Sequence, residues 1–518
     1  MPGTITPLLT NISLCEATTG WTAVDGTNTL NADVPIQSAG CIHNYSVSAG
    51  DRGSDYDFGA DTNLSNTNLY FWFALSKTAI VGDYGSTGMR VRVTNSAGDW
   101  GEWYLFGKNT IAHNGWTPWT ISTDLAFDAQ SATPPSLSSI RKVGWRANAV
   151  LAKGYIYFDA WRYGTGLKIT LGTAASPVTW EDIFAADNDS NNKYGVIIKY
   201  QGVYYLQGKL QFGDAAQTAI TYFKDVSKII IFQDAKVGGS FYEIVLVGAT
   251  GYKTSFVLGV KSGTVGISGC IFNAASSTKP YKLLATDANI DAFGFYGCTF
   301  LEANTISLPA DATNHEVLNS SFEKCVEVLV STCITENCNF ISADDESILL
   351  PSGNTHKTKN SSFINNPNAT RIPNAGTYTF DGLKFTGNTI DIDNTSGGAV
   401  TVNCYNGANP TTETGDTTIN TAVTLTVQGV KTGTEPTNYV RCRIETYPGG
   451  VQLMNEEANQ SYGSEGYYRA TESYNYTSDQ EVVVKARYKG YLPFEGKSTI
   501  TSSGLVMTAI WLPDPNYV

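Results

Sequence analysis

The chain has 518 residues, of which 42% are hydrophobic and only 16% charged, and its formal net charge is −13. This length exceeds what one hydrophobic core usually serves, so we expect about two to four domains. The negative charge, without a basic stripe that carries interleaved aromatic residues, argues against a nucleic-acid partner and against an anionic membrane surface. Gly, Ser, Thr and Asn replace the missing charged residues, and this composition predicts an all-β protein of strands and turns.

The first residues, MPGTITPLLTNISL, have neither the basic start nor the apolar run of a secretory signal. No stretch approaches the roughly 20 apolar residues of a membrane-spanning helix. We therefore expect synthesis in a cytoplasm and no membrane partner. The nine cysteines show no CxxC and no His-paired ligand set, so we interpret most of them as reduced, buried, small residues, with a Cys325–Cys333 pair as the minor alternative.

The N-terminal region, residues 1–165, is rich in tryptophan and is expected to form a jelly-roll-like β-sandwich, similar in outline to carbohydrate-binding modules. Eight of the ten tryptophans precede residue 165. Strand-like runs separated by Gly, Ser and Asn are expected at 68–75, 88–95, 102–107, 141–147 and 153–164. In the last of these runs, alternation predicts that Tyr155, Tyr157, Asp159 and Trp161 share one face of the sheet.

Residues 166–415 contain a repeat in which a phenylalanine ends each short strand. Successive phenylalanines are 28, 22, 18, 23 and 22 residues apart, and the residue two positions earlier is usually small. The predicted inward-facing residues are Cys270, Phe272, Cys298, Phe300, Ser320, Phe322, Cys338, Phe340, Ser361, Phe363, Leu383 and Phe385. Coils of about 20 residues cannot bury an apolar face alone but can do so when stacked, which predicts a right-handed parallel β-helix. A helix is expected only near 179–188.

Asparagines at the coil corners fit tight bends, because asparagine tolerates left-handed conformations. They are Asn319, Asn337, Asn360 and Asn388. The polar stretch 406–420 is interpreted as either a linker or a cap. Strand patterns after it predict a small Ig-like β-sandwich over 416–518.

This order of modules resembles the virion appendage and decoration proteins of tailed bacteriophages, namely fibres, spikes and head fibres. The segment WEDIFAADNDSNNKYGVIIKYQGVYYLQGKLQFGD looks like the lead-in to their pectate-lyase-like β-helices, and VVVKARYKGYLPFEGKSTITSSGLVMTAIW looks like their terminal sandwich. The resemblance covers most of residues 166–518 in style and carries no catalytic motif. It implies a homotrimer on the virion surface that contacts other virion proteins of the capsid or tail and adheres to host-surface or environmental glycans.

The candidate glycan-binding residues are Trp100, Trp103, Trp116 and Trp119, because indole rings stack on sugar rings and occur here beside turn residues. The alternative is that these rings fill the core of a tryptophan-rich sandwich. The acidic run at 51–61 offers Asp51, Asp55, Asp57 and Asp61 as oxygen ligands for a structural calcium ion, although no bidentate Glu follows. A solvated acidic loop is the alternative interpretation there. We expect no other cofactor.

Some phage spikes with this architecture cleave polysaccharides, and hydrolysis needs two carboxylates about 5–10 Å apart. The candidate carboxylates are Asp287, Asp291, Asp344, Asp345, Glu346, Asp391 and Asp393, and candidate lyase bases are His315, Lys324, His356, Lys357, Lys359 and Arg371. Adjacent carboxylates that only keep the surface soluble are the alternative. We expect a non-enzymatic adhesion protein, with a depolymerase, or a bacterial polysaccharide-binding or pectinase-like protein, as the rival hypotheses.

Overall fold

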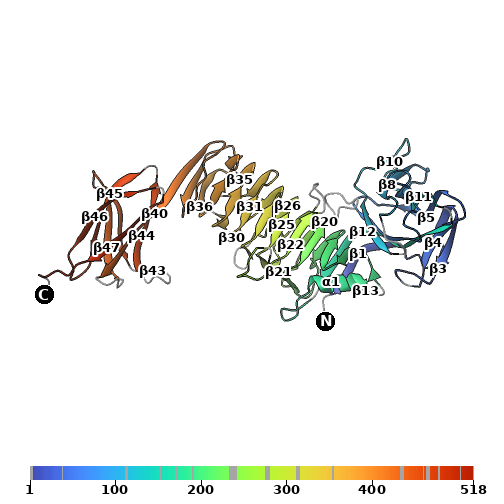
Figure 1. The fold of residues 1–518 in the computed structure, drawn as a ribbon, viewed down its shortest axis with the longest axis horizontal. Coiled ribbons are helices and arrows are strands. Elements are labelled where there is room, and N and C mark those ends of the chain that lie inside the picture. Colours follow the sequence, from blue (N-terminus) through green and yellow to red (C-terminus); the bar gives the residue numbers. More distant parts are fainter. Residues whose placement is uncertain are drawn as a thin grey trace. The chain divides into compact units, whose positions relative to one another are not determined.

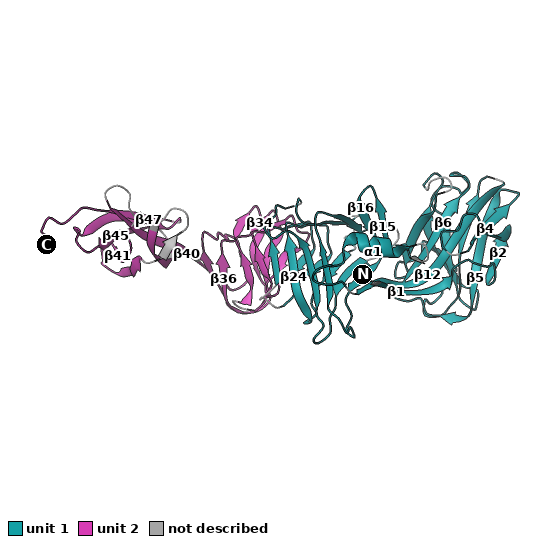
Figure 2. Ribbon diagram, turned by 90° about the horizontal axis from the view of Figure 1, so that it is seen from below, with its two compact units in different colours: residues 1–329 teal, residues 330–518 magenta. Residues whose placement is uncertain are grey.

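The computed structural model describes residues 4–37, 39–110, 115–151, 153–170, 172–189, 192–232, 242–265, 267–274, 281–310, 315–352, 355–431, 437–458, 460–462, 467–476, 479–501 and 503–516 (Figure 1). Over these ranges the regular structure consists of strands and one helix, α1 (Trp180–Asp187), so the predicted all-β class is confirmed. The chain divides into two compact units, residues 1–329 and 330–518 (Figure 2). Within the described ranges, no helix has the length and apolar character needed to cross a membrane.

The first unit begins with two packed sheets, as expected for a sandwich. One sheet has six strands in the order β10 (Ala129–Gln130), β8 (Trp100–Phe106), β7 (Met89–Thr94), β11 (Ile140–Ala149), β5 (Gly50–Thr62) and β2 (Trp21–Asp25). The other sheet contains β1 (Thr4–Ser13), β3 (Thr27–Asn31), β4 (Cys41–Ser46), β6 (Asn68–Leu75), β9 (Thr117–Ser122) and β12 (Gly154–Thr170). Their inner faces bury Phe73, Val91, Trp145 and Phe158 in a common core. The sandwich is therefore held together by apolar burial between its sheets.

A bulge in β12 changes the predicted orientation of Trp161. Ala160 has a positive φ of 52°, and the pairing of β12 with β6 shifts register between Asp159 and Arg162. A bulge inserts one residue and so moves the following side chains to the opposite face. Trp161 is consequently buried in the core, 4.6 Å from the Phe71 ring centroid, and the prediction that it shares a face with Tyr155 is wrong.

Strand β12 continues beyond the sandwich and pairs in parallel with β17 (Lys209–Phe212) from Gly166 to Ile169. Gly166 has a φ of 155°, and a Cβ atom there would lie 2.0 Å from the Lys209 carbonyl oxygen. Only glycine permits this approach. Helix α1 follows, at the predicted place. Its N-cap Thr179 and Asp182 form a capping box. The short strands β13 (Asn188–Asp189), β14 (Asn192–Lys193) and β15 (Ile197–Tyr200) complete the lead-in.

The rest of the first unit is a stack of coils, each of which contributes one strand to each of three parallel sheets. The first sheet contains β16 (Val203–Leu206), β19 (Ile229–Phe232), β22 (Ile271–Ala274), β25 (Thr299–Leu301) and β28 (Ser321–Glu323). The second contains β17, β20 (Tyr242–Leu246), β23 (Tyr281–Leu284), β26 (Thr305–Ser307) and β29 (Glu327–Leu329). The third contains β18 (Thr221–Asp225), β21 (Thr254–Gly259), β24 (Ile290–Tyr296) and β27 (His315–Leu318). The handedness of the coil stays a prediction.

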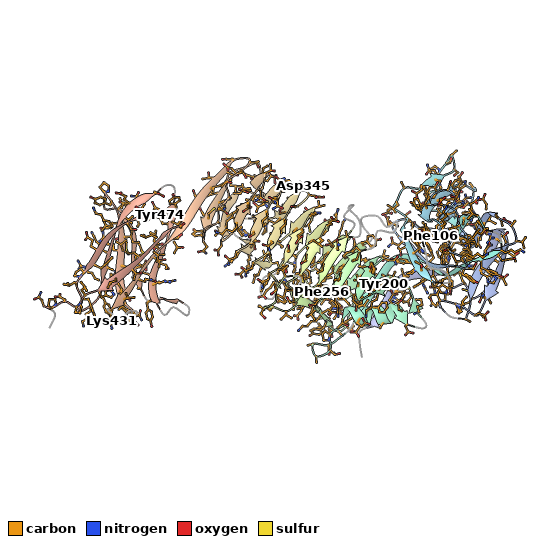
Figure 3. The ribbon with its side chains drawn as sticks, viewed as in Figure 1. Phe106, Tyr200, Phe256, Asp345, Lys431 and Tyr474 are labelled. Carbon is orange, nitrogen blue, oxygen red and sulfur yellow. The ribbon has the colours of Figure 1, made fainter. Side chains whose placement is uncertain are left out.

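Aromatic rings form columns inside this stack. Phe272, Phe300 and Phe322 are in register on adjacent strands, with ring centroids 5.2 and 5.1 Å apart and nearly parallel planes. Phe256, labelled in Figure 3, stacks in the same way on Phe223 at 4.9 Å. Cys270, Cys298 and Ser320, two residues before the column, are fully buried. A small and a large residue therefore point inward at each of these coils, and each stacks on its counterpart in the next coil.

The second unit begins with the same arrangement of coils. One sheet contains β31 (Asn339–Ile341), β34 (Ser362–Ile364) and β37 (Lys384–Thr386); another β32 (Glu346–Leu349), β35 (Asn368–Ile372) and β38 (Ile390–Asn394); the third β30 (Ile334–Glu336), β33 (Lys357–Lys359), β36 (Gly376–Asp381) and β39 (Val400–Tyr405). Phe340, Phe363 and Phe385 stack with centroids 5.0 Å apart. At the corners, Asn319 of the first unit and Asn337 and Asn360 of the second have positive φ angles. All nine cysteines of the chain are buried thiols.

The polar stretch after Tyr405 packs on the last coil, which favours a cap over a linker. Asp391 accepts hydrogen bonds from the backbone N–H groups of Thr411 and Thr412, at 2.7 and 3.2 Å. The Thr414 hydroxyl donates to Asp393 at 2.7 Å. These bonds pair the polar groups of the last coil with those of the cap.

The 15-residue strand β40 (Thr417–Lys431) follows this cap and continues into the C-terminal sandwich. β40 pairs in parallel with β39 up to Thr421, and from Thr421 it pairs antiparallel with β44 (Tyr467–Tyr476). The same sheet includes β43 (Gln460–Tyr462) and β47 (Leu505–Trp511). The facing sheet has the order β42 (Gln452–Ala458), β41 (Val440–Thr446), β45 (Gln480–Arg487) and β46 (Phe494–Ile500). The two sheets share a core around Leu425, Ile444 and Trp511.

Candidate functional site: an aromatic sheet face

The outer face of β3, β4, β12 and β6 carries rings in two rows that the strand register defines. In one row, Thr27 lies opposite Tyr45, and Tyr45 lies opposite Tyr155. In the other, Thr29, His43, Tyr157 and Ala74 lie on successive strands. The intervening residues, such as Ile42, Ile156 and Phe158, point into the core. Alternation along each strand therefore directs these rings to the outside.

We call the set Tyr45, His43, Tyr155, Tyr157 and Trp116 the aromatic face. The Tyr45 and Tyr155 ring centroids are 5.0 Å apart, and those of His43 and Tyr155 are 4.8 Å apart. The Tyr157 ring lies 5.6 Å from His43 and 6.4 Å from Trp116. Tyr155 is 36% exposed, and the other four rings are partly exposed. Such contacts hold the rings as one ordered patch that is open to solvent.

A hollow of about 170 Å³ lies in this face, lined by Val34, Ala74, Trp116 and Tyr157. It exists because Ala74 has only a methyl group where its neighbour across the strand, Tyr157, has a large ring. The Trp116 indole forms one wall, and its Nε1 donates a hydrogen bond to the Val34 carbonyl oxygen at 2.9 Å. That bond fixes the indole plane beside the hollow, so the wall is preorganised.

The aromatic face is uncharged near neutral pH. Burial lowers the pKa of His43 below its usual 6.5, so its imidazole is neutral. Burial also raises the pKa of the Tyr157 phenol. The side-chain nitrogens of Asn31 and His43 lie 3.5 Å apart at the edge of the patch. Apolar ring faces with neutral polar tips can contact a ligand without the cost of desolvating a charge.

The outer face of the opposite, six-stranded sheet has a different chemistry. Arg92 contacts Glu102 at 2.7 Å, and its guanidinium lies 4.2 Å from the centre of the Trp100 ring. Arg146 makes two bonds to Asp55, at 2.7 and 2.8 Å. We call this set the ion-paired face. Its charged groups are satisfied by one another, since Glu102 also contacts Arg90.

The four tryptophans predicted to bind glycans do not form one exposed set. Trp103 is fully buried, donates to the Leu125 carbonyl oxygen and packs on Phe127, so the prediction that it is exposed is wrong. Trp119 stacks on Phe106 at 4.8 Å and packs against the core. Trp100 lies on the ion-paired face, and only Trp116 belongs to the aromatic face. Trp100 and Trp103 are three residues apart in one strand, a spacing that already directs them to opposite faces.

The aspartates considered as calcium ligands are part of a strand. Residues 50–62 form β5, so the interpretation of this stretch as a loop is wrong. Asp55 is engaged by Arg146, Asp57 by Arg141 at 2.7 Å, and Asp51 accepts from Asn148 at 3.1 Å. The backbone N–H of Gly59 and the Arg141 guanidinium lower the pKa of Asp57. Within the described residues, no group of three or more His, Cys, Asp or Glu side chains is placed to hold a metal ion.

Five of the seven carboxylates considered for hydrolysis have structural partners: Asp287, Asp291, Glu346, Asp391 and Asp393. Asp391 is buried and holds the cap through Thr411 and Thr412. Glu346 is paired with Arg371, and burial raises the pKa of Glu346. Other candidates are likewise bonded: Asp287 to the backbone of Asn289, Asp291 to Ser255, Asp393 to Thr414, Lys359 to Asp381 and Lys324 to Glu302. Asp344 and Asp345 are exposed, whereas His315 and His356 are buried.

No family model matches the sequence, and no curated protein matches it. Among solved structures, the chain is similar to the family 11 carbohydrate-binding module of the cellulosomal cellulase Lic26A-Cel5E of Clostridium thermocellum, with 11% identity over 30% of this chain and 93% of the module, and a TM-score of 0.22. The chain is also similar to the CBM22-1 xylan-binding domain from Paenibacillus barcinonensis Xyn10C. The identity is 13% over 32% of this chain and 97% of the domain, and the TM-score is 0.22. An exo-β-agarase gives 11% identity over 30% of this chain and a TM-score of 0.23, and the chain spans only 24% of its length.

Proposed function

We propose that this chain is a glycan-binding protein and that the aromatic face of its first sandwich is the binding site. The observation that carries the proposal is the group of five clustered, partly exposed rings around the hollow over Ala74. Sugar rings present apolar C–H faces together with hydroxyl groups. Flat aromatic side chains bury the first, and phenol and threonine hydroxyls bond the second.

The proposal gives each part of the aromatic face a role. Trp116 and Tyr157 flank the hollow, so one sugar ring or ring substituent enters between them. Tyr155 and Tyr45 extend the platform for the next ring, and the hydroxyls of Thr27 and Thr29 are exposed in register beside it. Because no charged residue belongs to the aromatic face, the expected ligands are neutral glycans.

Binding of the full chain to a printed array of neutral oligosaccharides tests this proposal, followed by titration calorimetry with the best ligand. The double variant Tyr155→Ala/Tyr157→Ala should abolish binding and leave the circular dichroism spectrum unchanged. Tyr200→Ala is the matched control, because Tyr200 is a 63% exposed tyrosine on β15, outside this face (Figure 3). Unchanged binding by the double variant, or no binding to any neutral glycan, would refute the proposed site.

We further propose that this binding serves adhesion, with the chain displayed on a tailed-phage virion as a homotrimeric appendage or decoration. The lead-in and C-terminal segments that resemble such proteins, and the order of sandwich, coils and sandwich, support this setting. Several copies of a weak site on one particle would gain avidity through their high effective concentration. Light scattering should give three times the mass of one chain, and immunogold labelling should mark the particle surface. A monomer and unlabelled particles would contradict this setting, and release of oligosaccharides from a bound polysaccharide would contradict its non-enzymatic character.

A further inference from the structure

The C-terminal sandwich carries a cluster of positive charge on the outer face of its four-stranded sheet. Within this sheet, β41 and β45 are neighbours (Figure 2). Cys442, Ile444 and Ala486 are buried in the core, so the residues that alternate with them along the two strands point outward. Four of these outward residues are exposed cations, and we call them the cationic cluster: Arg441, Arg443, Lys485 and Arg487.

Strand register places these like charges directly opposite one another. Arg441 lies opposite Arg487, and Arg443 lies opposite Lys485, on adjacent antiparallel strands. Side chains in such positions have Cβ atoms about 4.5–5.5 Å apart, and like charges there destabilise a sheet. Two such rows follow one another in a chain whose net charge is −13. A local arrangement that opposes folding is expected at a binding site rather than on a surface that only stabilises the sheet.

The row formed by Arg443 and Lys485 is partly neutralised within the sheet. The Glu445 carboxylate contacts Arg443 and lies 2.7 Å from the Lys485 ammonium group. The hydrogen bond from Lys485, together with the charge of Arg443, lowers the pKa of Glu445, so this carboxylate is ionised near neutral pH. One carboxylate therefore serves two cations, and the row keeps a positive charge.

The row formed by Arg441 and Arg487 has no such compensation. Arg441 Nε donates to Asn455 Oδ1 at 3.1 Å, and this acceptor is uncharged. Glu457 lies opposite Arg441 on β42. Even so, in the part of the chain that the structure describes, neither arginine of this row makes an ion pair. Two guanidinium groups are therefore available side by side, and each presents a planar fork of N–H donors that matches a carboxylate or a phosphate.

An exposed tyrosine lies next to this row. Tyr439 directly precedes β41 and is 69% exposed, and its backbone N–H donates to the Ala458 carbonyl oxygen at 2.9 Å. The ring offers an apolar surface to the C–H face of a sugar, close to the guanidinium groups that would take an anionic substituent of that sugar. This combination favours an acidic glycan over a small inorganic anion.

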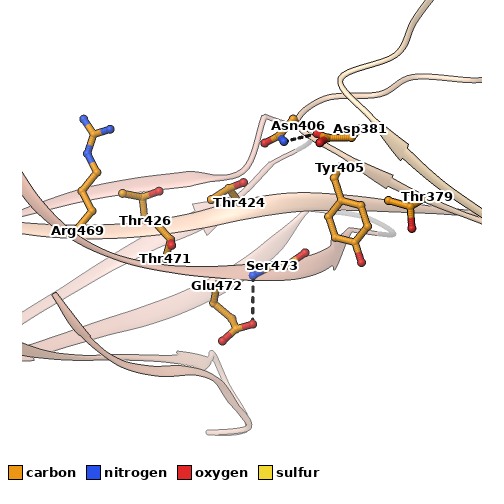
Figure 4. Close-up of a pocket in the computed structure, with 10 residues that line it drawn as sticks. All are labelled: Thr379, Asp381, Tyr405, Asn406, Thr424, Thr426, Arg469, Thr471, Glu472 and Ser473. Carbon is orange, nitrogen blue, oxygen red and sulfur yellow. Dashed lines mark hydrogen bonds between the residues drawn. The ribbon is translucent and has the colours of Figure 1, made fainter. Parts of the chain in front are cut away.

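The sheet that faces this one has a different surface. A pocket beside β40 and β44 is lined largely by hydroxyl groups, such as those of Thr424 and Thr426 (Figure 4). Two carboxylates, Asp381 and Glu472, also line it together with one arginine, Arg469, so the lining has no excess of positive charge. The excess of positive charge therefore belongs to the face that β41 and β45 form.

We propose that the cationic cluster binds an anionic glycan, with a carboxylate or phosphate group on Arg441 and Arg487 and a sugar ring on Tyr439. This site differs from the aromatic face in both position and chemistry. It does not depend on the function proposed for the first sandwich, and it gives the chain a second class of glycan ligand.

The test measures binding of the full chain to two pairs of polymers: polygalacturonate beside its fully methyl-esterified form, and phosphomannan beside neutral mannan. At least one anionic polymer should bind in preference to its neutral counterpart, and its affinity should fall as salt is added. The two pairs distinguish a carboxylate from a phosphate as the bound group. Single-stranded DNA is measured alongside, because a nucleic acid is the other polyanion that attracts clustered cations.

Arg441→Gln/Arg487→Gln should lower the affinity for the anionic polymer roughly tenfold or more, because charge-assisted hydrogen bonds are lost. In urea this variant should be at least as stable as the parent chain, since it removes a like-charge pair, so the loss of binding is not a loss of folding. Glu457→Gln should act in the opposite direction and raise the affinity by up to about fivefold, because a negative charge beside Arg441 is removed.

Lys253→Gln/Lys384→Gln is the matched control, because it removes two positive charges from exposed positions outside the C-terminal sandwich. This control and Tyr155→Ala/Tyr157→Ala should both retain binding to the anionic polymer. The proposal fails if neither anionic polymer binds in preference to its neutral form, or if DNA binds more tightly than both. It also fails if the double arginine variant binds as well as the parent chain, or if Glu457→Gln binds less tightly.

Discussion

The two outer faces of the first sandwich are built from strands of the same kind, yet they carry opposite chemistry. On the ion-paired face, each charged group has a protein partner, as in Arg146 with Asp55 and Arg92 with Glu102. On the aromatic face, the rings pack edge-on or tilted against one another and leave a hollow open. A face whose charged groups are paired with one another stabilises the fold. A face whose apolar rings are exposed to solvent is available to a ligand. Surface exposure alone does not separate these roles.

The largest effect that the comparison predicts is on binding. Tyr155→Ala/Tyr157→Ala removes two adjacent rings, and truncating a central aromatic contact typically costs about 2 kcal/mol, or roughly thirtyfold in affinity. The double variant should therefore fall below detection in calorimetry. The corresponding loss on the other face, Trp100→Ala, should leave neutral-glycan affinity unchanged. If Trp100→Ala lost the ligand and the tyrosine variant kept it, the roles of the two faces would be reversed.

The second effect is on stability. Arg146→Met leaves Asp55 mostly buried without its bidentate partner, which should lower the free energy of unfolding by about 2 kcal/mol. Urea denaturation measures this loss. The affinity for neutral glycans should stay the same, because Arg146 lies on the opposite sheet. A variant that is as stable as the parent chain would show that this ion pair does not stabilise the sandwich.

A third change fills the hollow without removing any contact. Ala74→Leu places a larger side chain between Tyr157 and Trp116 and should reduce affinity about tenfold by excluding the inserted sugar ring. Calorimetry with the same ligand measures the reduction. Val24→Leu is the control for an enlarged side chain away from the hollow, because Val24 is an exposed residue on β2 of the opposite sheet. Unchanged affinity in Ala74→Leu would place the ligand outside the hollow.

The smallest effect concerns pH. Burial keeps the pKa of His43 in the folded chain below 6.5, so the unfolded chain binds a proton first as the pH falls. The free energy of unfolding should then decrease below about pH 6.5, and affinity should fall as His43 becomes charged beside the ligand. Asp57 on the other sheet has a lowered pKa, so its contribution persists down to about pH 4. His43→Gln should flatten the affinity profile between pH 7 and pH 5, and an unchanged profile would exclude His43 as the titrating group.

Part of this structure can be predicted from the sequence, because it depends only on the spacing and identity of residues that are close together in the chain. The spacing of Phe272, Phe300 and Phe322 reflects the length of one coil, since each ring must lie above the last. Alternation likewise places Tyr155 and Tyr157 together. Helix α1 has its capping residues within four positions of one another. Such features need no knowledge of distant partners.

Other features depend on contacts that the sequence does not display. His43 and Tyr45 are more than 100 residues from Tyr155, and the pairing of β4 with β12 brings them together. No glycine or proline marks the bulge at Ala160 in the sequence. Simple alternation along the strand therefore does not predict that Trp161 points into the core. The partners of Asp55 and Asp57 come from β11, 91 and 84 residues later. In these cases tertiary pairing decides what a residue can do.

The long strands β12 and β40 have a mechanical consequence. Each one leaves a sandwich and enters a coil, or the reverse, without a loop, by changing its hydrogen-bonding partners along a continuous backbone. Tension along the chain at either place would act parallel to the strand, so that several backbone hydrogen bonds must break together and not one after another. A transition of this kind has no hinge at which the modules could separate before the strand itself is pulled out.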